Sequence, residues 1–403
     1  MLGLSSTGEV YSGNSAEAQP PTIHESVELR PRLGAGGDAF GFAVDIENDV
    51  AVVGAAEDSE QHVQSGAVYV FERNASGAWI ETTKLFAQDS GPCQHFGSSV
   101  ALDGNRLVIG QTGVECPPDG DLIASSVYVF ERRAAGWVQS AKLQPPSGAR
   151  FNFAFFTALD RKIALAGQEK NAYAYTRQAD RRWSSPVTLP ATEAVGDDEY
   201  SGPRLDVSGN TVVLGSTGLA IEAAFVDIYQ AQPHGTWRRA TTIAFPRPGT
   251  DFWGRPHVAI EGNVLLADRF VYERKANGAW RRTATLLPAD APLPDEFPGE
   301  SALSSRGVAV LTAFEFIGQD FPTTAYVYKR MSRGSWTRIA TLSPAQNGAR
   351  FFGRVDTDGR SVIAGGITAH GERVAYIFEV PRGAGKSKGR YDQSWPKDIG
   401  WSE

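Results

Sequence analysis

Charged and aromatic side chains that could act on a ligand stand just before, or at the start of, the first strand of each unit of a repeated pattern. The second, third and seventh units carry basic groups there, and the fourth to sixth units carry carboxylates and aromatic rings. The candidate ligand-binding residues are His95, Arg150, Asp198, Glu199, Tyr200, Asp251, Trp253, His257, Asp295, Glu296 and Arg350. A polar, aromatic-lined pocket of this kind can hold a sugar or a charged peptide segment. Ordinary solvated loop charges are the competing interpretation.

Two subsets of these residues could support catalysis. His95, Arg150, Tyr200 and Arg350 are the types that a polysaccharide lyase needs, because a cation neutralises a uronate while Tyr or His moves the proton. Paired carboxylates, such as Asp251 and Glu296, suit a glycosidase. Neither a Gly-x-Ser-x-Gly elbow nor a His-Glu-x-x-His pair occurs in the chain. Since any loop rim contains residues of these types, the sequence favours a binding module over an enzyme.

The elements that must position these residues are strands of a seven-fold repeat. The third strand of the unit recurs at residues 66–71, 126–130, 172–175, 226–229, 269–272, 325–328 and 375–378. The first six copies are each followed by a tryptophan, namely Trp79, Trp137, Trp183, Trp237, Trp280 and Trp336. A period near fifty residues with four strand signals predicts an all-β, seven-bladed β-propeller with four-stranded antiparallel blades.

The two ends of the chain are expected to share one blade. The last repeat ends near residue 380 without a fourth strand, whereas residues 24–33 carry the alternating pattern that follows each tryptophan. The N-terminal strand should therefore pair into the last blade as its outer strand and close the ring. This division predicts a disordered lead-in at 1–23, the propeller at 24–380, and a flexible basic linker with a tryptophan-containing tail at 381–403.

The repeat resembles the FG-GAP repeat, most closely its bacterial variety. The first unit carries Phe40-Gly41, Val53-Gly54, Gly66 to Phe71 and Gly77-Ala78-Trp79, and the resemblance extends over residues 26–380. It implies an integrin-α-like propeller that is usually extracellular and usually a binding module. The family often holds Ca²⁺ in Asp-x-Asp-x-Asp-Gly loops, and no such loop occurs in this sequence. We therefore expect no metal site and no cofactor, although carboxylate-rich loops could hold Ca²⁺ weakly.

Composition limits the possible binding partners of the protein and the compartment in which it is expected. A net charge of -7, with only 21% charged residues, argues against nucleic acid, and no apolar run is long enough to span a bilayer. No signal peptide is visible at the start. Cys93 and Cys116 should lie on one side of the second blade, so they could form a disulfide, which would imply an oxidising compartment; two free thiols are the alternative. A secreted or cell-surface monomer is the resulting expectation.

The loops between the second and third strands are expected to build the functional face. They are long at residues 55–65, 111–125 and 313–323 and nearly absent in the third and fifth units. Long walls beside low blades make a groove, and grooves are where ligands bind. We therefore predict an extracellular propeller that binds a protein or glycan through this loop-rich face. The alternative is a polysaccharide-active enzyme, a lyase or glycosidase, at the mouth of the central channel.

Overall fold

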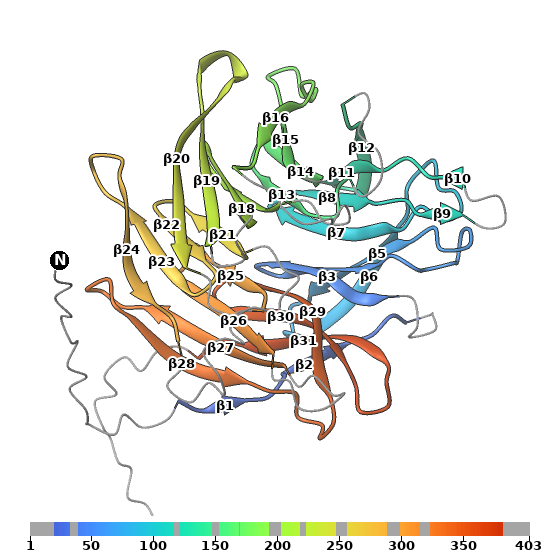
Figure 1. Ribbon diagram of the computed structural model, residues 1–403. Coiled ribbons are helices and arrows are strands. Elements are labelled where there is room, and N and C mark those ends of the chain that lie inside the picture. The colour runs from blue at the N-terminus through green and yellow to red at the C-terminus, as the bar shows by residue number, and fades with distance from the viewer. Residues whose placement is uncertain are drawn as a thin grey trace, which may run out of the picture.

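Four-stranded antiparallel sheets stand around a central axis in the computed structural model (Figure 1). The structure describes residues 20–32, 39–116, 121–146, 153–168, 170–192, 203–217, 223–246, 256–287, 299–314 and 323–381. Six of the blades in the described structure are four-stranded sheets, and the remaining one gains a short fifth strand that pairs in parallel, so the predicted seven-bladed propeller is confirmed. Within the described part, no helix is long and apolar enough to cross a membrane. The predicted tail from residue 382 onward lies outside the described residues.

In each blade the strands follow one another from the channel to the outer edge. Blade 1 comprises β3 (Phe40–Glu47), β4 (Val50–Ala55), β5 (Ala67–Arg73) and β6 (Trp79–Leu85); blade 2 comprises β7 (Phe96–Asp103), β8 (Arg106–Gln111), β11 (Ser126–Arg133) and β12 (Gly136–Leu143); and blade 3 comprises β13 (Thr157–Asp160), β14 (Ile163–Gln168), β15 (Asn171–Thr176) and β16 (Val187–Pro190). Blade 4 comprises β17 (Arg204–Ser208), β18 (Thr211–Thr217), β19 (Ala223–Ala231) and β20 (Trp237–Pro246), and blade 5 comprises β21 (Val258–Glu261), β22 (Val264–Ala267), β23 (Phe270–Arg274) and β24 (Trp280–Thr285). Blade 6 comprises β25 (Ser301–Leu303), β26 (Val308–Phe314), β27 (Thr323–Arg330) and β28 (Trp336–Leu342), and blade 7 comprises β29 (Arg350–Thr357), β30 (Ser361–Ile367), β31 (Arg373–Glu379) and β2 (Val27–Leu29).

Burial along the strands explains the sequence pattern. Every residue of β4 is buried, because neighbouring blades cover both faces of a middle strand, whereas β6 alternates between partly buried and exposed residues at the outer edge. The apolar clusters cross from blade to blade: one joins Val52 and Val70 of blade 1 to Ile109 of blade 2. The core is therefore a continuous ring of inter-blade contacts, and no blade is covered on its own.

Glycine recurs where an inner strand comes close to the third strand of the preceding blade. A Cβ on Gly41 would lie 2.4 Å from the Val374 carbonyl oxygen of blade 7, and one on Gly97 would lie 2.5 Å from that of Ala67 in blade 1. Both glycines also have positive φ, at 87° and 94°. A larger residue there would push two blades apart, which explains the Phe-Gly pair in the repeat.

The aromatic residue of this motif is not the one that the sequence indicated in blade 7. The Phe-Gly pair of the repeat occurs in the blade 7 sequence as Phe352-Gly353, but Phe351 takes the place of Phe40 and packs against Phe378 with ring centroids 5.6 Å apart. Phe352 is 37% exposed instead. The error arises because the glycine directly follows Phe40 in blade 1 and Phe96 in blade 2, whereas in blade 7 it stands two residues after Phe351; the bulge that follows the aromatic residue is the same in all three blades.

The N-terminal segment closes the ring as predicted. β2 pairs antiparallel with β31, with Val27 opposite Ile377 and Leu29 opposite Ala375. Figure 1 shows this blue strand beside the red C-terminal strands. The preceding β1 (Thr22–Ile23) pairs in parallel with β28 of blade 6, so folded structure begins earlier than the expected residue 24. The chain start thus ties blades 6 and 7 together.

Ion pairs also join neighbouring blades near the ends of their third strands. Arg73 of blade 1 reaches Glu379 of blade 7 at 2.7 Å, and Arg132 of blade 2 reaches Glu72 of blade 1 at 2.5 Å. Arg177 and Glu131 repeat the contact between blades 3 and 2. The Glu-Arg pair that ends the third strand in blades 1 and 2 therefore makes contacts between blades. Its arginine in blade 1, Arg73, strengthens the junction between the last blade and the first.

Candidate functional site

One equivalent position lies on, or directly before, the inner strand of each blade, and the seven residues at this position form what we call the upper ring. The inner strands contact one another in a closed circle around the axis (Figure 1). The position lies opposite the glycine of the second strand, or opposite its counterpart where glycine is replaced. Its occupants are Ala43, Ser99, Phe156, Arg204, His257, Glu300 and Arg354. The small residues stand in blades 1 and 2, and the ionisable ones stand in blades 4 to 7.

The ionisable residues of the upper ring contact one another. Arg204 Nη1 lies 3.0 Å from Glu300 Oε1, and His257 Nδ1 lies 3.1 Å from Glu300 Oε2. Arg354 donates from Nη2 to the Phe155 carbonyl oxygen at 2.8 Å. The Arg204 and Arg354 guanidinium carbons lie 4.2 and 4.5 Å from the centroid of the same Phe156 ring. Two guanidinium groups therefore converge on one aromatic ring beside a single carboxylate.

The pKa shifts in the ring follow from burial and from these neighbours. Burial opposes ionisation of Glu300, but Arg204, His257 and Arg354 together hold its pKa well below the ordinary value. Burial, reinforced by Arg204, lowers the pKa of His257, and burial lowers that of Arg354 to about 10. Near neutral pH, the ring thus holds two arginine cations, a neutral imidazole and one carboxylate. Within the upper ring itself, two positive charges therefore face one negative charge, and the buried Asp268 carboxyl, which accepts from His257 N at 2.9 Å, lies beside the ring.

Water reaches this cluster. The side chains of Arg204 and Glu300 keep 21% and 19% of their surface exposed, and that of His257 keeps 12%. A ligand can therefore approach the positive excess without opening a sealed core.

An apolar wall lies near the charged residues. Phe42, Phe155 and Phe352 come from blades 1, 3 and 7, and the Phe42 ring centroid lies 6.2 Å from that of Phe155 and 6.3 Å from that of Phe352. Phe155 also meets Phe156 of the upper ring at 5.0 Å. The site consequently combines aromatic surface with convergent charged groups, the composition expected of a ligand pocket.

A second group, of ionisable residues and one aromatic ring, lies where blades 7, 1 and 2 meet. We call it the rim cluster, and it consists of Glu57, His95, Arg350, Phe352 and Arg373. The Arg373 guanidinium carbon lies 3.7 Å from the Phe352 ring centroid, and Nη1 of Arg373 is buried without a hydrogen-bond partner in the described structure. Arg350 and Arg373 stand on either side of Ile367 in the blade 7 sheet. Burial lowers the pKa of Arg373 and of His95, and in both cases the nearby Glu57 carboxylate opposes the shift.

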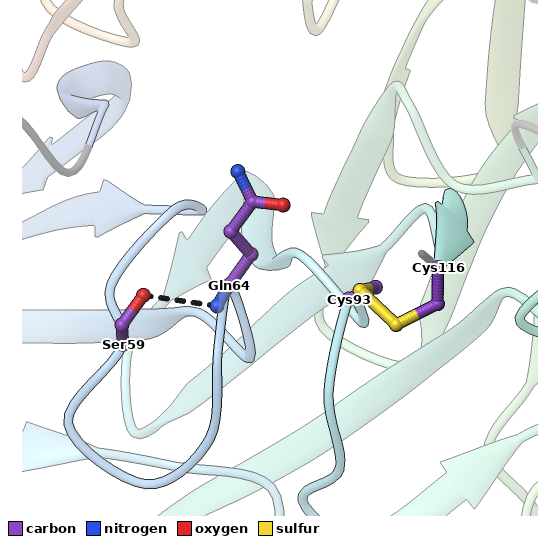
Figure 2. The surroundings of a disulfide bond; sticks show 4 residues. All are labelled: Ser59, Gln64, Cys93 and Cys116. Atoms are coloured by element: carbon purple, nitrogen blue, oxygen red, sulfur yellow. Dashed lines mark hydrogen bonds between the residues drawn. A yellow bond between two sulfur atoms is a disulfide. The ribbon is translucent and has the colours of Figure 1, made fainter. Parts of the chain in front are cut away.

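A disulfide holds the segment that carries His95. Figure 2 shows the bond between Cys93 and Cys116, whose Cα atoms are 5.5 Å apart, so the predicted pairing is confirmed. Backbone bonds reinforce it: Cys93 N donates to Val63 O at 2.8 Å, and Val114 N donates to Cys93 O at 3.1 Å. The segment before β7 is therefore fastened between the long loops of blades 1 and 2.

The structure describes three of the residues that the sequence proposed for the site. His257 belongs to the upper ring, whereas His95 and Arg350 belong to the rim cluster. The remaining candidates, Arg150, Asp198, Glu199, Tyr200, Asp251, Trp253, Asp295 and Glu296, lie outside the described residues. In the part of the chain that is described, no group of three His, Cys, Asp or Glu side chains is arranged to hold a metal ion.

The sequence patterns did not reveal Arg204, Glu300 and Arg354. They placed the site just before the predicted inner strands, whereas Arg354 lies inside β29, Arg204 begins β17 and Glu300 directly precedes β25. A usable signal was present: aligned on the glycine of the second strand, the position is Ala or Ser in blades 1 and 2 but charged in blades 4, 6 and 7. A charge at a position that packing fills with Ala or Ser elsewhere in the repeat indicates a role other than packing.

Two residues further along the same strands, carboxyl groups cap the free inner edges of the blades. Asp45 accepts from Leu102 N at 2.8 Å, Asp206 from Ile260 N at 2.7 Å, and Asp356 from Ile46 N at 3.0 Å. Each bond runs to the inner strand of the next blade, whose edge N–H groups have no further strand to pair with. Burial raises the pKa of all three groups, and that of Asp206 reaches about 7.

Replacing Asp206 by asparagine should stabilise the protein in a pH-dependent manner. Because burial raises the folded-state pKa of Asp206, its carboxyl is neutral in both the folded and the unfolded protein below about pH 4 and does not lower the unfolding free energy there. The unfolding free energy falls as the pH rises from about 4 through about 7. Asparagine keeps an acceptor for Ile260 N but carries no charge. We expect equal unfolding free energies at about pH 3.5 and a gain of about 2 kcal/mol for D206N at about pH 8, about half the full shift because water enters the channel. Denaturant titration at both pH values checks this, with exposed Asp49→Asn as control. An equal effect at both pH values would contradict it.

Comparison with known proteins supports the repeat. The FG-GAP repeat family matches residues 25–71 and 79–130, so the resemblance seen in the sequence is confirmed there. No curated protein matches the sequence. Among solved structures, a protein from Lactobacillus plantarum is 11% identical over 82% of this chain and 95% of that one, with a TM-score of 0.48. Candidate 6-phosphogluconolactonases from Bacteroides uniformis (12%, 81% and 95%, TM-score 0.49) and Bacteroides fragilis (11%, 83% and 96%, TM-score 0.45) are similar to the same degree. No activity transfers at these identities and TM-scores.

Proposed function

Since this chain carries FG-GAP repeats and folds as a seven-bladed propeller, we propose that it is an extracellular binding module that recognises a glycan or protein through its loop-rich face. An acidic group of the ligand enters the mouth of the central channel. Arg204 and Arg354 receive it.

The excess positive charge of the upper ring carries this proposal. A half-buried cation without a counterion is costly, and Glu300 neutralises only one of the two guanidinium groups. An anion bound beside Arg204 and Arg354 would complete the balance. Stacking on Phe156 and the bond to the Phe155 carbonyl hold the guanidinium groups in place, so little ordering entropy is lost on binding.

The disulfide supports the extracellular part of the proposal. Disulfides persist in oxidising compartments, and this one braces two long loops of the binding face.

A lyase is the second candidate, and His257 is the observation that favours it. Its lowered pKa keeps the imidazole neutral, and Glu300 accepts from Nδ1, which leaves Nε2 as a base beside two cations. This arrangement could neutralise a uronate and remove its proton. It assigns the base to His257, whereas the sequence pointed to His95 or Tyr200. The glycosidase alternative rests on Asp251 and Glu296, which lie outside the described residues.

Calorimetric titration of acidic glycans and acidic peptides into the purified protein tests the binding proposal. We expect Arg354→Gln to weaken binding at least tenfold, and the same change at Arg281, an exposed residue of β24, to leave it unchanged. Equal affinities for the wild type and R354Q would overturn the proposal. Incubation with acidic polysaccharide, followed by ultraviolet absorbance of unsaturated uronate, tests the lyase: no signal, or an equal signal from His257→Gln, would rule it out.

A further inference from the structure

Building on the extracellular part of the proposed function, we propose that Asn74 is the acceptor of an N-linked glycan. Asn74, Ala75 and Ser76 form the only Asn-x-Ser/Thr triplet in the chain. Transferases of the secretory route modify the asparagine of such a triplet, and the Cys93–Cys116 disulfide favours the same oxidising compartment. A triplet alone is only a sequence match, so the proposal depends on how the structure presents it.

The triplet lies in the turn that joins β5 to β6 in blade 1. Backbone bonds close this turn, because Asn74 N donates to Ala78 O and Gly77 N donates to Asn74 O, each at 2.9 Å. Every residue from 74 to 78 is exposed. A Cβ added to Gly77 would meet no heavy atom within 4 Å, so the space over the turn is open. The acceptor is therefore on a surface segment that a transferase can reach.

The Asn74 side chain keeps its nitrogen available. Its Oδ1 accepts from Ser76 N at 3.0 Å, from Ser76 Oγ at 2.7 Å and from Ala78 N at 3.0 Å. All three bonds use the oxygen, and Nδ2 makes no hydrogen bond to the described part of the chain. Attaching a sugar replaces one hydrogen on Nδ2 and retains the carbonyl oxygen, so the turn keeps all of these bonds when it carries a glycan.

The transfer needs one co-substrate, an oligosaccharide joined to a lipid through a pyrophosphate. Asn74 Nδ2 attacks the anomeric carbon of this donor, and a C–N bond forms. The C–O bond to the pyrophosphate breaks, and the lipid pyrophosphate leaves with the bonding electron pair. One Nδ2 proton passes to the transferase, so the step balances without an oxidant or a reductant.

A glycan at Asn74 would leave the loop-rich face uncovered. β5 runs from Ala67, which follows the long loop of blade 1, to Arg73, which directly precedes the turn. Asn74 therefore lies at the opposite end of this strand from the loop that carries Glu57. Glycosylation and ligand binding at the loop-rich face should consequently be independent of each other.

Secretion of the full chain from a eukaryotic cell line that performs N-glycosylation, followed by peptide mass spectrometry, tests the proposal. We expect a glycan on the peptide that contains Asn74, and treatment with peptide-N-glycosidase should release it and leave aspartate at position 74. Asn74→Gln and Ser76→Ala should lose the modified peptide completely. Ser76→Thr, which keeps the hydroxyl, should retain it. Thermal unfolding of the S76A protein at the temperature of the deglycosylated wild type would show that the loss is not a folding defect.

Blade 5 offers a matched control. Its turn from β23 to β24 is closed by the same bonds, from Lys275 N to Ala279 O and from Gly278 N to Lys275 O, both at 2.8 Å. Asn277 in this turn is exposed, but Ala279 stands where the triplet needs a hydroxyl, so Asn277 should stay unmodified. The double change Lys275→Asn with Asn277→Ser reproduces the blade 1 triplet and should create a second glycosylated turn.

The outcomes separate this proposal from the proposed ligand site. An unmodified Asn74 in the secreted wild type, or as much glycan on S76A as on the wild type, would overturn the glycosylation site. An unmodified turn in the blade 5 double variant would also contradict it, since the argument rests on the triplet and the exposed turn together. N74Q should bind acidic glycans and peptides with wild-type affinity. A glycosylated protein that binds neither ligand would overturn the anion site and leave the glycosylation site supported.

Discussion

Replacing Glu300 by glutamine is expected to lower the unfolding free energy by about 3 kcal/mol near neutral pH and to tighten the binding of small carboxylates at least tenfold. Glu300 is the carboxylate that meets both Arg204 and His257. Glutamine keeps the size of the side chain and one acceptor oxygen, but it removes the negative charge that faces Arg204 and Arg354. We expect the loss of unfolding free energy to lie near the lower end of the range for breaking a buried ion pair, because water reaches the channel.

The prediction is specific because the unfolding free energy should fall while the affinity for carboxylates should rise. If Glu300 served only to hold the blades, its replacement would weaken the fold without improving anion binding. Chemical unfolding and titration of galacturonate, both with wild type and E300Q, measure the two effects. Glu372→Gln is the matched control, because Glu372 pairs with Arg30 on the surface, where solvent screens the pair, and its replacement should leave the unfolding free energy nearly unchanged. Loss of carboxylate affinity in E300Q would contradict the proposed charge balance.

Removing the disulfide is expected to cost about 3 kcal/mol, the value for a closed loop of roughly this size. Cys93 and Cys116 are 23 residues apart, and the loop they close contains β7 and β8. The double replacement by serine should also weaken ligand binding, because Cys93 anchors the segment that carries His95 of the rim cluster.

Reductant provides the internal control for this prediction. Wild-type protein in dithiothreitol should match the double serine variant in unfolding free energy, and the variant should not respond to reductant at all. A change below about 0.5 kcal/mol in both comparisons, well under the usual range for a native disulfide, would show that the backbone bonds from Cys93 to Val63 and Val114 already hold the loops without the bridge.

The blade architecture was predictable because every unit repeats the same local physics. A middle strand such as β4 must be apolar on both faces, and the outer strand that begins at Trp79 alternates between partly buried and exposed residues. The order of apolar and polar residues therefore reveals the repeat period. Closure by residues 27–29 followed because blade 7 lacked its outer strand. The short β1 was missed because two residues on a blade edge leave no periodic signal.

The disulfide was predictable for a topological reason, since the connection before β7 and the loop after β8 emerge on one face of blade 2. The site was predicted less well. Arg354 stands three residues after Phe351, as Ala43 does after Phe40, but the sequence indicated Phe352 as the aromatic residue of blade 7, so counting from it misses Arg354. His257 was found, but its partners Arg204 and Glu300 come from other blades, and only the closed ring brings them together. Register within a strand can be read from a repeat, whereas contacts across the channel depend on the whole assembly.

A crystal structure with bound galacturonate tests the proposed anion site most directly. We predict that the carboxylate lies within hydrogen-bond distance of the Arg204 and Arg354 guanidinium groups, with the sugar ring against Phe42 or Phe155. A carboxylate bound elsewhere on the protein, with the upper ring unchanged, would contradict this prediction.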